Sequence, residues 1–263
     1  MYLKIRHAEY WVEQYGEGEP VLFLHGFTGS SLTWHALRSF FPNNRMILID
    51  LPGHGKTKAE TLTSMKDCCD AISAILSQLE IRKVHIVGYS MGGRTALTFA
   101  HLYPSFVKSL VLESASPGIM NKEEREERKK GDVALVSFLR TNPLEAFVDK
   151  WENLPLFASQ KSMVKEKQAA VRQERLAQSA EGLAHSLTTM GTGVMPSLWE
   201  QLHRLECSVL LVVGEKDDKF VLLNRKMESL ISNCTFKMIE DAGHAIHVEQ
   251  TQIFGTIVEE FIN

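Results

Sequence analysis

The chain has 263 residues, 44% of them hydrophobic, which is enough to bury a sizeable core in one α/β unit or in two small ones. Its formal net charge of −3 at pH 7 gives no electrostatic reason to expect a nucleic-acid partner or a membrane surface. No segment approaches the ~18 apolar residues of a membrane span, and the first residues lack the apolar stretch of a signal peptide.

Short apolar segments alternate with segments of helical periodicity along the chain. We expect strands at residues 8–15, 21–24, 45–50, 84–89, 107–112, 209–213 and 236–239. We expect helices at residues 63–79, 94–103, 222–231 and 248–262. The first strand is expected at an edge. Strands that alternate with helices predict an α/β fold with a mostly parallel sheet and right-handed crossovers.

The stretch Gly88-Tyr89-Ser90-Met91-Gly92 has the G-x-S-x-G pattern of a nucleophile elbow. The turn from strand to helix is so sharp that the serine should adopt strained backbone angles. A Cβ at either glycine would collide across the turn. An ordinary strand-to-helix turn is the alternative, but the apolar strand and the amphipathic helix lie where an elbow needs them. We therefore expect the Ser90 hydroxyl to stand exposed at the C-terminal edge of the sheet.

A long segment between the strands at 107–112 and 209–213 lacks strand-like runs and carries mixed charge. Such a segment is too long for a structureless loop in a compact domain. We expect a helical cap at residues 116–206, inserted after the sixth strand and covering the edge where open α/β sheets bind ligands. The core would then comprise residues 1–115 and 207–263.

A serine hydroxyl needs an imidazole as a base, and the imidazole needs a carboxylate to orient it. Elbow proteins supply these partners after the serine, in the order Asp and then His. Asp217 follows one late strand and His244 follows the next, so both should reach the same sheet edge as Ser90. We assign Asp217 as the orienting carboxylate and His244 as the base.

Neighbouring residues compete for both of these assignments. Asp218 is a close alternative to Asp217, because it lies in the same loop. His247 is less favoured than His244, because it lies closer to the last helix.

Negative charge that develops on a substrate oxygen needs preorganised donors. The elbow offers the backbone N–H of Met91. The loop after the strand at 21–24 offers a second donor, and Phe27 in His25-Gly26-Phe27 is the natural candidate. Such a pair would stabilise a tetrahedral intermediate and an enolate equally well, so it does not define the reaction.

Arg94 lies four residues after Ser90, in the first turn of the helix that begins at the elbow. A guanidinium in this place would face the pocket and favour a substrate that bears a carboxylate. The alternative is an arginine that pairs with a neighbouring acid.

The elbow, the HGF loop, the Asp-Leu-Pro-Gly-His-Gly loop at 50–55 and the late Asp and His together resemble the α/β-hydrolase superfamily over nearly the whole chain. Finer motifs resemble one family in it, the synthases of menaquinone biosynthesis that make 2-succinyl-6-hydroxy-2,4-cyclohexadiene-1-carboxylate. The motifs are Gly88 to Arg94, Glu-Ser-Ala-Ser-Pro-Gly at 113–118, Trp-Glu-Asn-Leu-Pro-Leu-Phe-Ala-Ser-Gln at 151–160, Met-Gly-Thr-Gly at 190–193 and Gly-Glu-Lys-Asp-Asp-Lys-Phe at 214–220.

The resemblance implies a small-molecule substrate with three carboxylates and several cations to bind them. It assigns this role to Arg94, to Arg128 and to a third arginine, Arg175, with Arg172 as an open alternative. Tyr89 and Trp151 match positions near the substrate, although Trp151 could equally be part of the cap core. The implied fold is the α/β-hydrolase fold, with a mostly parallel central sheet flanked by helices.

The implied reaction eliminates pyruvate from 2-succinyl-5-enolpyruvyl-6-hydroxy-3-cyclohexene-1-carboxylate, with Ser90, His244 and Asp217 acting as the general base. It needs no metal and no cofactor. An esterase, thioesterase or C–C bond hydrolase that acts on a small acidic substrate is the first alternative. A non-catalytic receptor would be expected to lose part of the triad, and all three residue types are present.

The four cysteines form no C-x-x-C pair, and adjacent cysteines such as Cys68 and Cys69 make an improbable disulfide or metal unit. We interpret them as reduced thiols. Together with the lack of a signal peptide, this predicts a cytoplasmic protein.

Overall fold

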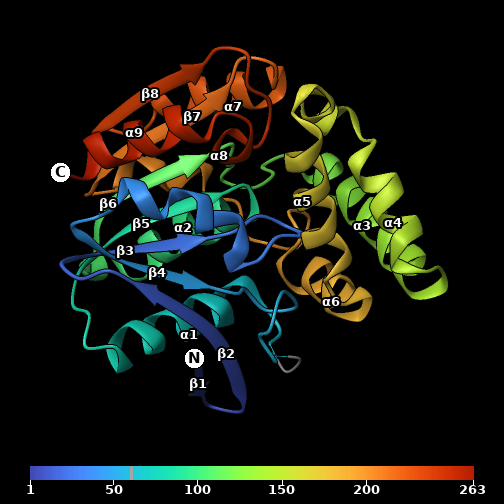
Figure 1. Cartoon of the computed structure of the whole chain (residues 1–263), viewed down its shortest axis with the longest axis horizontal. Coiled ribbons are helices and arrows are strands. Elements are labelled where there is room, and N and C mark those ends of the chain that lie inside the picture. The colour runs from blue at the N-terminus through green and yellow to red at the C-terminus, as the bar shows by residue number, and fades with distance from the viewer. Residues whose placement is uncertain (60–61) are drawn as a thin grey trace.

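The computed structural model describes residues 1–59 and 62–263, which build one eight-stranded sheet with helices on both faces (Figure 1). The strand order is β1-β2-β4-β3-β5-β6-β7-β8. The strands from β3 to β8 are parallel, and β2 is antiparallel to both of its neighbours. The strand bounds are Tyr2–Ile5, Ala8–Tyr15, Glu19–Leu24, Asn44–Ile49, Val84–Tyr89, Val107–Glu113, Ser208–Gly214 and Cys234–Ile239, from β1 to β8.

The two faces of the sheet each bury an apolar layer, because side chains alternate across a strand. Leu22 and Leu24 of β3 face α1 (Met65–Gln78) and α2 (Met91–Leu102). Val21 and Phe23 of the same strand face the 3-10 helix η1 (Ser31–Phe40) and the helix α9 (Thr251–Ile262). The remaining core helices are η2 (Pro104–Phe106), α7 (Asp218–Glu228) and α8 (Ile246–Glu249).

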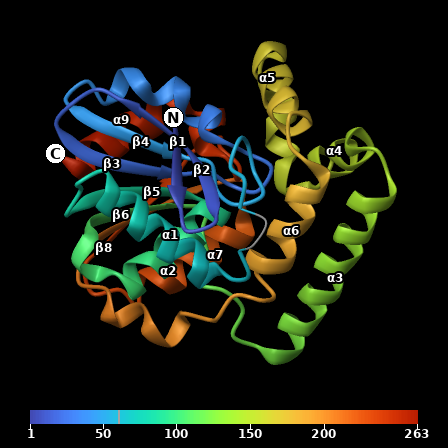
Figure 2. The same cartoon turned by 90° about the horizontal axis from the view of Figure 1, so that it is seen from below.

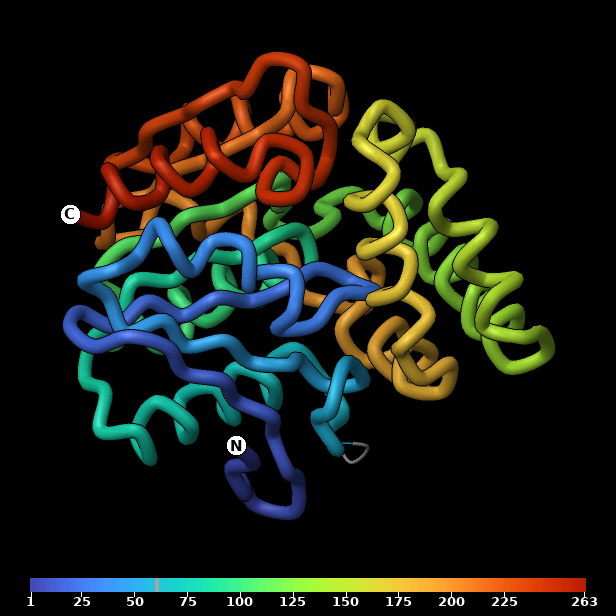
Figure 3. The backbone as a smooth tube through the Cα atoms, viewed as in Figure 1, coloured from blue at the N-terminus to red at the C-terminus, as the bar shows by residue number. Residues whose placement is uncertain are grey.

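The chain leaves the sheet after β6 and returns to it before β7 (Figure 3). In between it forms helices, of which α3 to α6 lie together on one side of the sheet, with α5 and α6 nearest to it in both views (Figures 1 and 2). Six of their residues form a separate small core: Leu139, Phe147, Val148, Leu183, Ala184 and Leu187. The elements are α3 (Lys122–Thr141), α4 (Leu144–Glu152), η3 (Pro155–Ser162), α5 (Lys165–Leu176), α6 (Ala180–Met190) and η4 (Trp199–Arg204).

This arrangement is the α/β-hydrolase fold expected from the sequence, with the helical insertion after the sixth strand. The division at residues 116 and 206 remains a prediction. Met195, Trp199 and Leu202 near the end of the insertion pack with the sheet core rather than with α3 to α6.

Several boundaries expected from the sequence are wrong. The strand Ala8–Tyr15 is not at the edge, because β1 pairs with its outer side. β1 has only four residues, which is too short a run for its alternation of exposed and buried side chains to be recognised in the sequence. The sequence patterns also predict no helix at residues 31–40, where the structure has η1.

Two helices begin earlier than the periodicity of their apolar residues suggested. α2 starts at Met91 instead of at residue 94, and α7 starts at Asp218 instead of at residue 222. The first turn of α2 contains two glycines, which have no apolar side chain, so apolar periodicity does not mark where this helix begins.

All four cysteines are free, and Cys68 and Cys69 are buried. Burial raises the pKa of the Cys68 thiol to about 12, so this thiol stays protonated at neutral pH. Among the described residues, no helix is both long enough and apolar enough to cross a bilayer.

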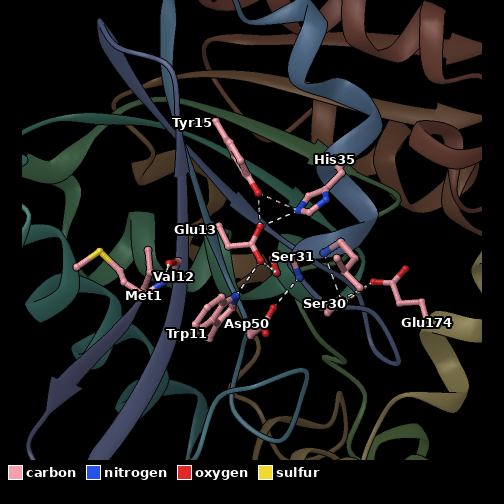
Figure 4. Close-up of polar contacts among 11 residues, drawn as sticks. Met1, Trp11, Val12, Glu13, Tyr15, Ser30, Ser31, His35, Asp50 and Glu174 are labelled. Carbon is pink, nitrogen blue, oxygen red and sulfur yellow. Dashed lines mark hydrogen bonds and ion pairs between the residues drawn. The ribbon is translucent and has the colours of Figure 1, made fainter.

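A polar network joins β2 to η1 and to the helical insertion (Figure 4). The Glu13 carboxylate accepts hydrogen bonds from Trp11 Nε1 and from the Tyr15 hydroxyl, at 2.8 and 2.7 Å, and contacts His35 Nε2 at 2.7 Å. The Ser31 hydroxyl also donates to Glu13, at 3.2 Å. Burial would raise the pKa of Glu13, but the hydrogen bonds from Tyr15, Trp11 and His35 outweigh it and lower the pKa to about 2.

Glu13 should therefore contribute to the pH dependence of stability. A carboxyl whose pKa is lower in the folded state stabilises the protein above its unfolded value of about 4.5, and this contribution disappears as the pH falls toward about 2. We expect the free energy of unfolding of Glu13→Gln to change less between pH 6 and pH 3 than that of the wild type. Urea unfolding at both pH values measures the difference, and an identical pH dependence in the two proteins would contradict the prediction.

Candidate active site

Ser90 lies at the turn between β5 and α2 with φ 49° and ψ −103°. A non-glycine residue with such angles costs about 1–3 kcal/mol, and surrounding contacts must hold it in place. Here the Ser90 N–H donates to the carbonyl of Glu113 at 2.8 Å. A Cβ on Gly88 would lie 2.6 Å from the carbonyl oxygen of Gly92, and one on Gly92 would collide with the carbonyl of Leu24. Only glycines allow this turn.

The residues expected to form a triad meet at the hydroxyl of Ser90. His244 Nε2 lies 3.0 Å from Ser90 Oγ, and His244 Nδ1 lies 2.6 Å from Asp217 Oδ2. His244 and Asp217 are both buried, whereas Asp218 is exposed in the first turn of α7. The geometry therefore favours Asp217 over Asp218 as the partner of His244.

The loop that follows β3 is fixed by hydrogen bonds of His25 and by the close packing of Gly26 on the elbow. The His25 Nε2 accepts a hydrogen bond from Leu51 N–H at 2.9 Å, and Nδ1 contacts the carbonyl of Gly26 at 2.8 Å. Burial lowers the pKa of His25 to about 4, so its imidazole is neutral at pH 7. A Cβ on Gly26 would collide with the ring of Tyr89, the residue before Ser90.

The backbone N–H groups of Phe27 and Met91 make no hydrogen bond to any other described residue. Each belongs to a segment that adjoins Ser90, one from the loop after β3 and one from the start of α2. Unused donors of this kind are what an oxyanion hole requires.

A cavity lies beside the triad, between the loop after β3 and the helix α5. Its walls include Phe27, Tyr89, Phe157, Gln160 and Arg175. The Tyr89 hydroxyl has no hydrogen-bond partner among the described residues, and burial raises its pKa well above the ordinary value. The rings of Tyr89 and Phe157 lie 5.4 and 6.1 Å from that of His244, so two walls of the cavity lie next to the proposed base, although His244 itself does not line it.

Arg175 contributes a buried cation to this cavity. Its Nη2 donates to Gln160 Oε1 at 3.0 Å, and its guanidinium lies over the ring of Phe157. Burial lowers its pKa from the ordinary value. Its Nη1 also lies 3.8 Å from Glu152 Oε2. Arg172 forms ion pairs with three carboxylates, those of Glu145, Asp149 and Glu152, at 3.6, 2.7 and 2.6 Å. The structure therefore places Arg175, and not Arg172, where a ligand could reach it.

Arg94 and Arg128 form a second basic group where α2 meets α3. Burial, together with the nearby charge of Arg128, lowers the pKa of Arg94 to about 10. The Arg94 Nε is buried and has no hydrogen-bond partner among the described residues, while Nη2 donates to the carbonyl of Met190 at 3.4 Å. Arg128 Nε donates to Asp132 Oδ1 at 2.8 Å. The unused donor of Arg94 is a place for an anionic ligand group.

Trp151 packs among aromatic rings that lie between the Phe27 loop and the small core of the insertion. Its ring stacks on Phe147 at 5.6 Å and meets the edge of Phe27 at 5.2 Å. The Trp151 Nε1 is buried without a hydrogen-bond partner among the described residues. Trp151 packs against the small core and also borders the Phe27 loop, and its role near a substrate stays a prediction.

Several residues at this site carry no recognisable sequence signal. Thr33 and Glu174 line the cavity, and so does His247, which pairs with Glu113 and not with Ser90. Their roles depend on tertiary contacts alone. Among residues 1–59 and 62–263, no three His, Cys, Asp or Glu side chains gather in a way that could hold a metal ion.

Comparison with known proteins relates the chain to one fold family and one group within it. The family described as the alpha/beta hydrolase fold matches residues 19–251. The 2-succinyl-6-hydroxy-2,4-cyclohexadiene-1-carboxylate synthase of Citrobacter koseri is 32% identical, over 88% of this chain and 89% of the relative. A Bacillus subtilis (strain 168) protein, to which the same synthase activity is provisionally attributed, is 43% identical over 93% of this chain and 90% of its own.

A solved structure gives the same relationship in three dimensions. MenH from S. aureus matches with a TM-score of 0.92 and 38% identity, over 95% of this chain and 97% of that one.

The contact between His244 and Asp217 generates a prediction about the reactivity of Ser90. Replacing Asp217 with Asn favours the wrong imidazole tautomer, so the rate of Ser90 labelling by a fluorophosphonate should fall by about 10²–10⁴-fold. The matched variant Asp218→Asn should label at nearly the wild-type rate, because Asp218 is exposed. Labelling rates by mass spectrometry make the comparison, and equal rates in both variants would remove Asp217 from its assigned role.

Proposed function

This chain belongs to the α/β-hydrolase family and, within it, to the family of 2-succinyl-6-hydroxy-2,4-cyclohexadiene-1-carboxylate synthases, and we propose that it is the lyase that makes this compound in menaquinone biosynthesis. Its substrate is 2-succinyl-5-enolpyruvyl-6-hydroxy-3-cyclohexene-1-carboxylate, and pyruvate is the second product. It works as a cytoplasmic enzyme.

The observation that carries the proposal is the hydrogen-bonded series Ser90, His244 and Asp217 beneath a helix that supplies the buried Arg175. An ester hydrolase with an apolar acyl substrate has no use for Arg175 in its cavity or for an unused donor on Arg94. A small substrate with several carboxylates does, because each guanidinium can form charge-assisted hydrogen bonds with a carboxylate.

The reaction begins with removal of a proton from carbon. His244 Nε2 takes the proton of Ser90 Oγ, and the resulting oxyanion abstracts the ring proton α to the succinyl ketone. Asp217 holds His244 in the required tautomer and stabilises the imidazolium that forms. No acyl-enzyme is formed, because the serine oxygen acts as a base and not as a nucleophile.

The charge that leaves the carbon moves to the ketone oxygen. The N–H groups of Phe27 and Met91 stabilise this enolate, a contribution of roughly 3–4 kcal/mol for each donor. The electron pair then returns through the ring and breaks the C–O bond to the enolpyruvyl group. The departing enolate takes up the abstracted proton and leaves as pyruvate.

The substrate carboxylates bind to cations from both parts of the chain. Arg94 comes from the core helix α2, whereas Arg128 and Arg175 come from α3 and α5. Tyr89 and Trp151 provide the aromatic wall between these groups.

Ser90→Ala should abolish turnover of the proposed substrate, because no other oxygen takes the place of Ser90 Oγ beside His244. The loss should be on the order of 10⁴-fold or more. Release of pyruvate and growth of diene absorbance measure it directly. Substantial turnover by the variant would contradict the mechanism, and a wild type that hydrolyses an activated ester but releases no pyruvate would favour a hydrolase.

Arg175 and Arg172 form a matched pair of variants on one helix. Arg175→Ala should raise KM for the substrate by about 10- to 100-fold, since a hydrogen bond to a charged group contributes about 1.5–3 kcal/mol. Arg172→Ala should change KM by about 5-fold or less, because it removes ion pairs that are partly exposed. Steady-state kinetics distinguishes them, and equal effects would show that Arg175 has no special contact with the substrate.

A further inference from the structure

The loop that carries His244 is held by a carboxylate on both sides of that residue. Glu249 Oε2 accepts a hydrogen bond from the N–H of Gly243 at 2.8 Å, and its Oε1 accepts one from the N–H of Ala245 at 3.3 Å. Gly243 and Ala245 are the immediate neighbours of His244. The backbone that presents the imidazole is therefore fixed by one side chain from α8.

A second carboxylate holds the same loop from the sheet. Glu113, at the end of β6, is completely buried, and its Oε1 accepts the N–H of His247 at 3.0 Å. Both of its oxygens lie within 2.9–3.0 Å of His247 Nδ1. The carbonyl oxygen of the same residue accepts the N–H of Ser90. Glu113 thus contacts the backbone of the serine and the loop of the histidine at once.

His247 is itself enclosed, so it transmits the position of Glu113 to the loop. Its Nε2 lies 2.9 Å from the hydroxyl of Thr33, and its ring packs against Trp34 and Tyr89 with centroids 4.5 and 4.7 Å apart. A side chain with contacts on every side cannot change rotamer without displacing its neighbours.

We propose that Glu113 and Glu249 are positioning residues for His244, which keep its Nε2 within hydrogen-bond reach of Ser90 Oγ. The proposal rests on the proposed function in that His244 is the base. Neither glutamate contacts Ser90 Oγ or His244 by its side chain, so both act through the loop. A misplacement of about 1 Å in a catalytic group can cost about 10²-fold in rate, so a loop fixed at two points has a direct effect on turnover.

The test uses alanine at both positions and glutamine at Glu113. Glu113→Ala and Glu249→Ala should each lower kcat by about 100-fold with little change in KM, because the base moves while the arginines stay in place. Glu113→Gln should recover kcat to within about 10-fold of the wild type. Its amide oxygen can still accept from His247 N–H, and its amide nitrogen can donate to Nδ1 of the other tautomer.

A matched control separates positioning from stability. Glu13 is also a partly buried glutamate that accepts several hydrogen bonds, but it lies in the network between β2 and η1 (Figure 4). Glu13→Ala should lower the temperature of thermal unfolding and leave kcat unchanged. All variants are assayed well below their unfolding temperatures, so that loss of folded protein does not enter kcat.

Two outcomes would overturn the proposal. If Glu113→Ala and Glu249→Ala unfold at lower temperature but keep the wild-type kcat, the glutamates only stabilise the fold. If Glu113→Gln loses as much activity as Glu113→Ala, the charge of the carboxylate matters and the positioning does not.

The rate of Ser90 labelling by a fluorophosphonate is measured in parallel, because it reports on His244 without the proposed substrate. Labelling should slow in both alanine variants and recover in Glu113→Gln. If the wild type releases no pyruvate, the proposed function fails, and the labelling rates still decide whether the glutamates position His244.

Discussion

The close approach of α2 to the end of β3 is the constraint on which the site depends. Gly92 lies so near the carbonyl of Leu24 that no side chain fits between them, and Gly88 and Gly92 are similarly close across the turn. These contacts force Ser90 into its strained conformation and bring the start of α2 beside the loop that carries Phe27. The reactive oxygen and both unused N–H groups follow from the same packing.

The parallel sheet brings the loops that carry Ser90, Asp217 and His244 to one edge. The carboxyl ends of β5, β6, β7 and β8 lie at one edge, so loops far apart in sequence meet there. Ser90 and Asp217 could be predicted from the sequence because each follows an apolar strand that is buried along nearly its whole length. His244 follows the more polar strand β8, and the order Ser, Asp, His made it the candidate base. The same reasoning gave the fold and the position of the helical insertion. It did not detect β1, because a strand of four residues leaves little periodic signal, and it did not detect η1.

Which arginine of the insertion lines the cavity could not be predicted from the sequence. Arg172 and Arg175 lie three residues apart on α5, and only packing shows that one pairs with exposed carboxylates while the other is buried beside Gln160. The contacts of Glu113 and Glu249 could not be predicted from the sequence for a related reason. Each holds backbone N–H groups of a distant loop, and a hydrogen bond between a side chain and a remote backbone leaves no pattern in the sequence.

The helical insertion leaves the sheet after β6 and returns before β7, so it interrupts no strand that carries Ser90, Asp217 or His244. Two of the three arginines assigned to the substrate lie within it. Under the proposed function, substrate choice and proton transfer are thus encoded largely in separate stretches of one gene. Mutations that accumulate in α3 to α6 can redirect which acid is recognised while the apparatus that breaks the bond is passed on unaltered.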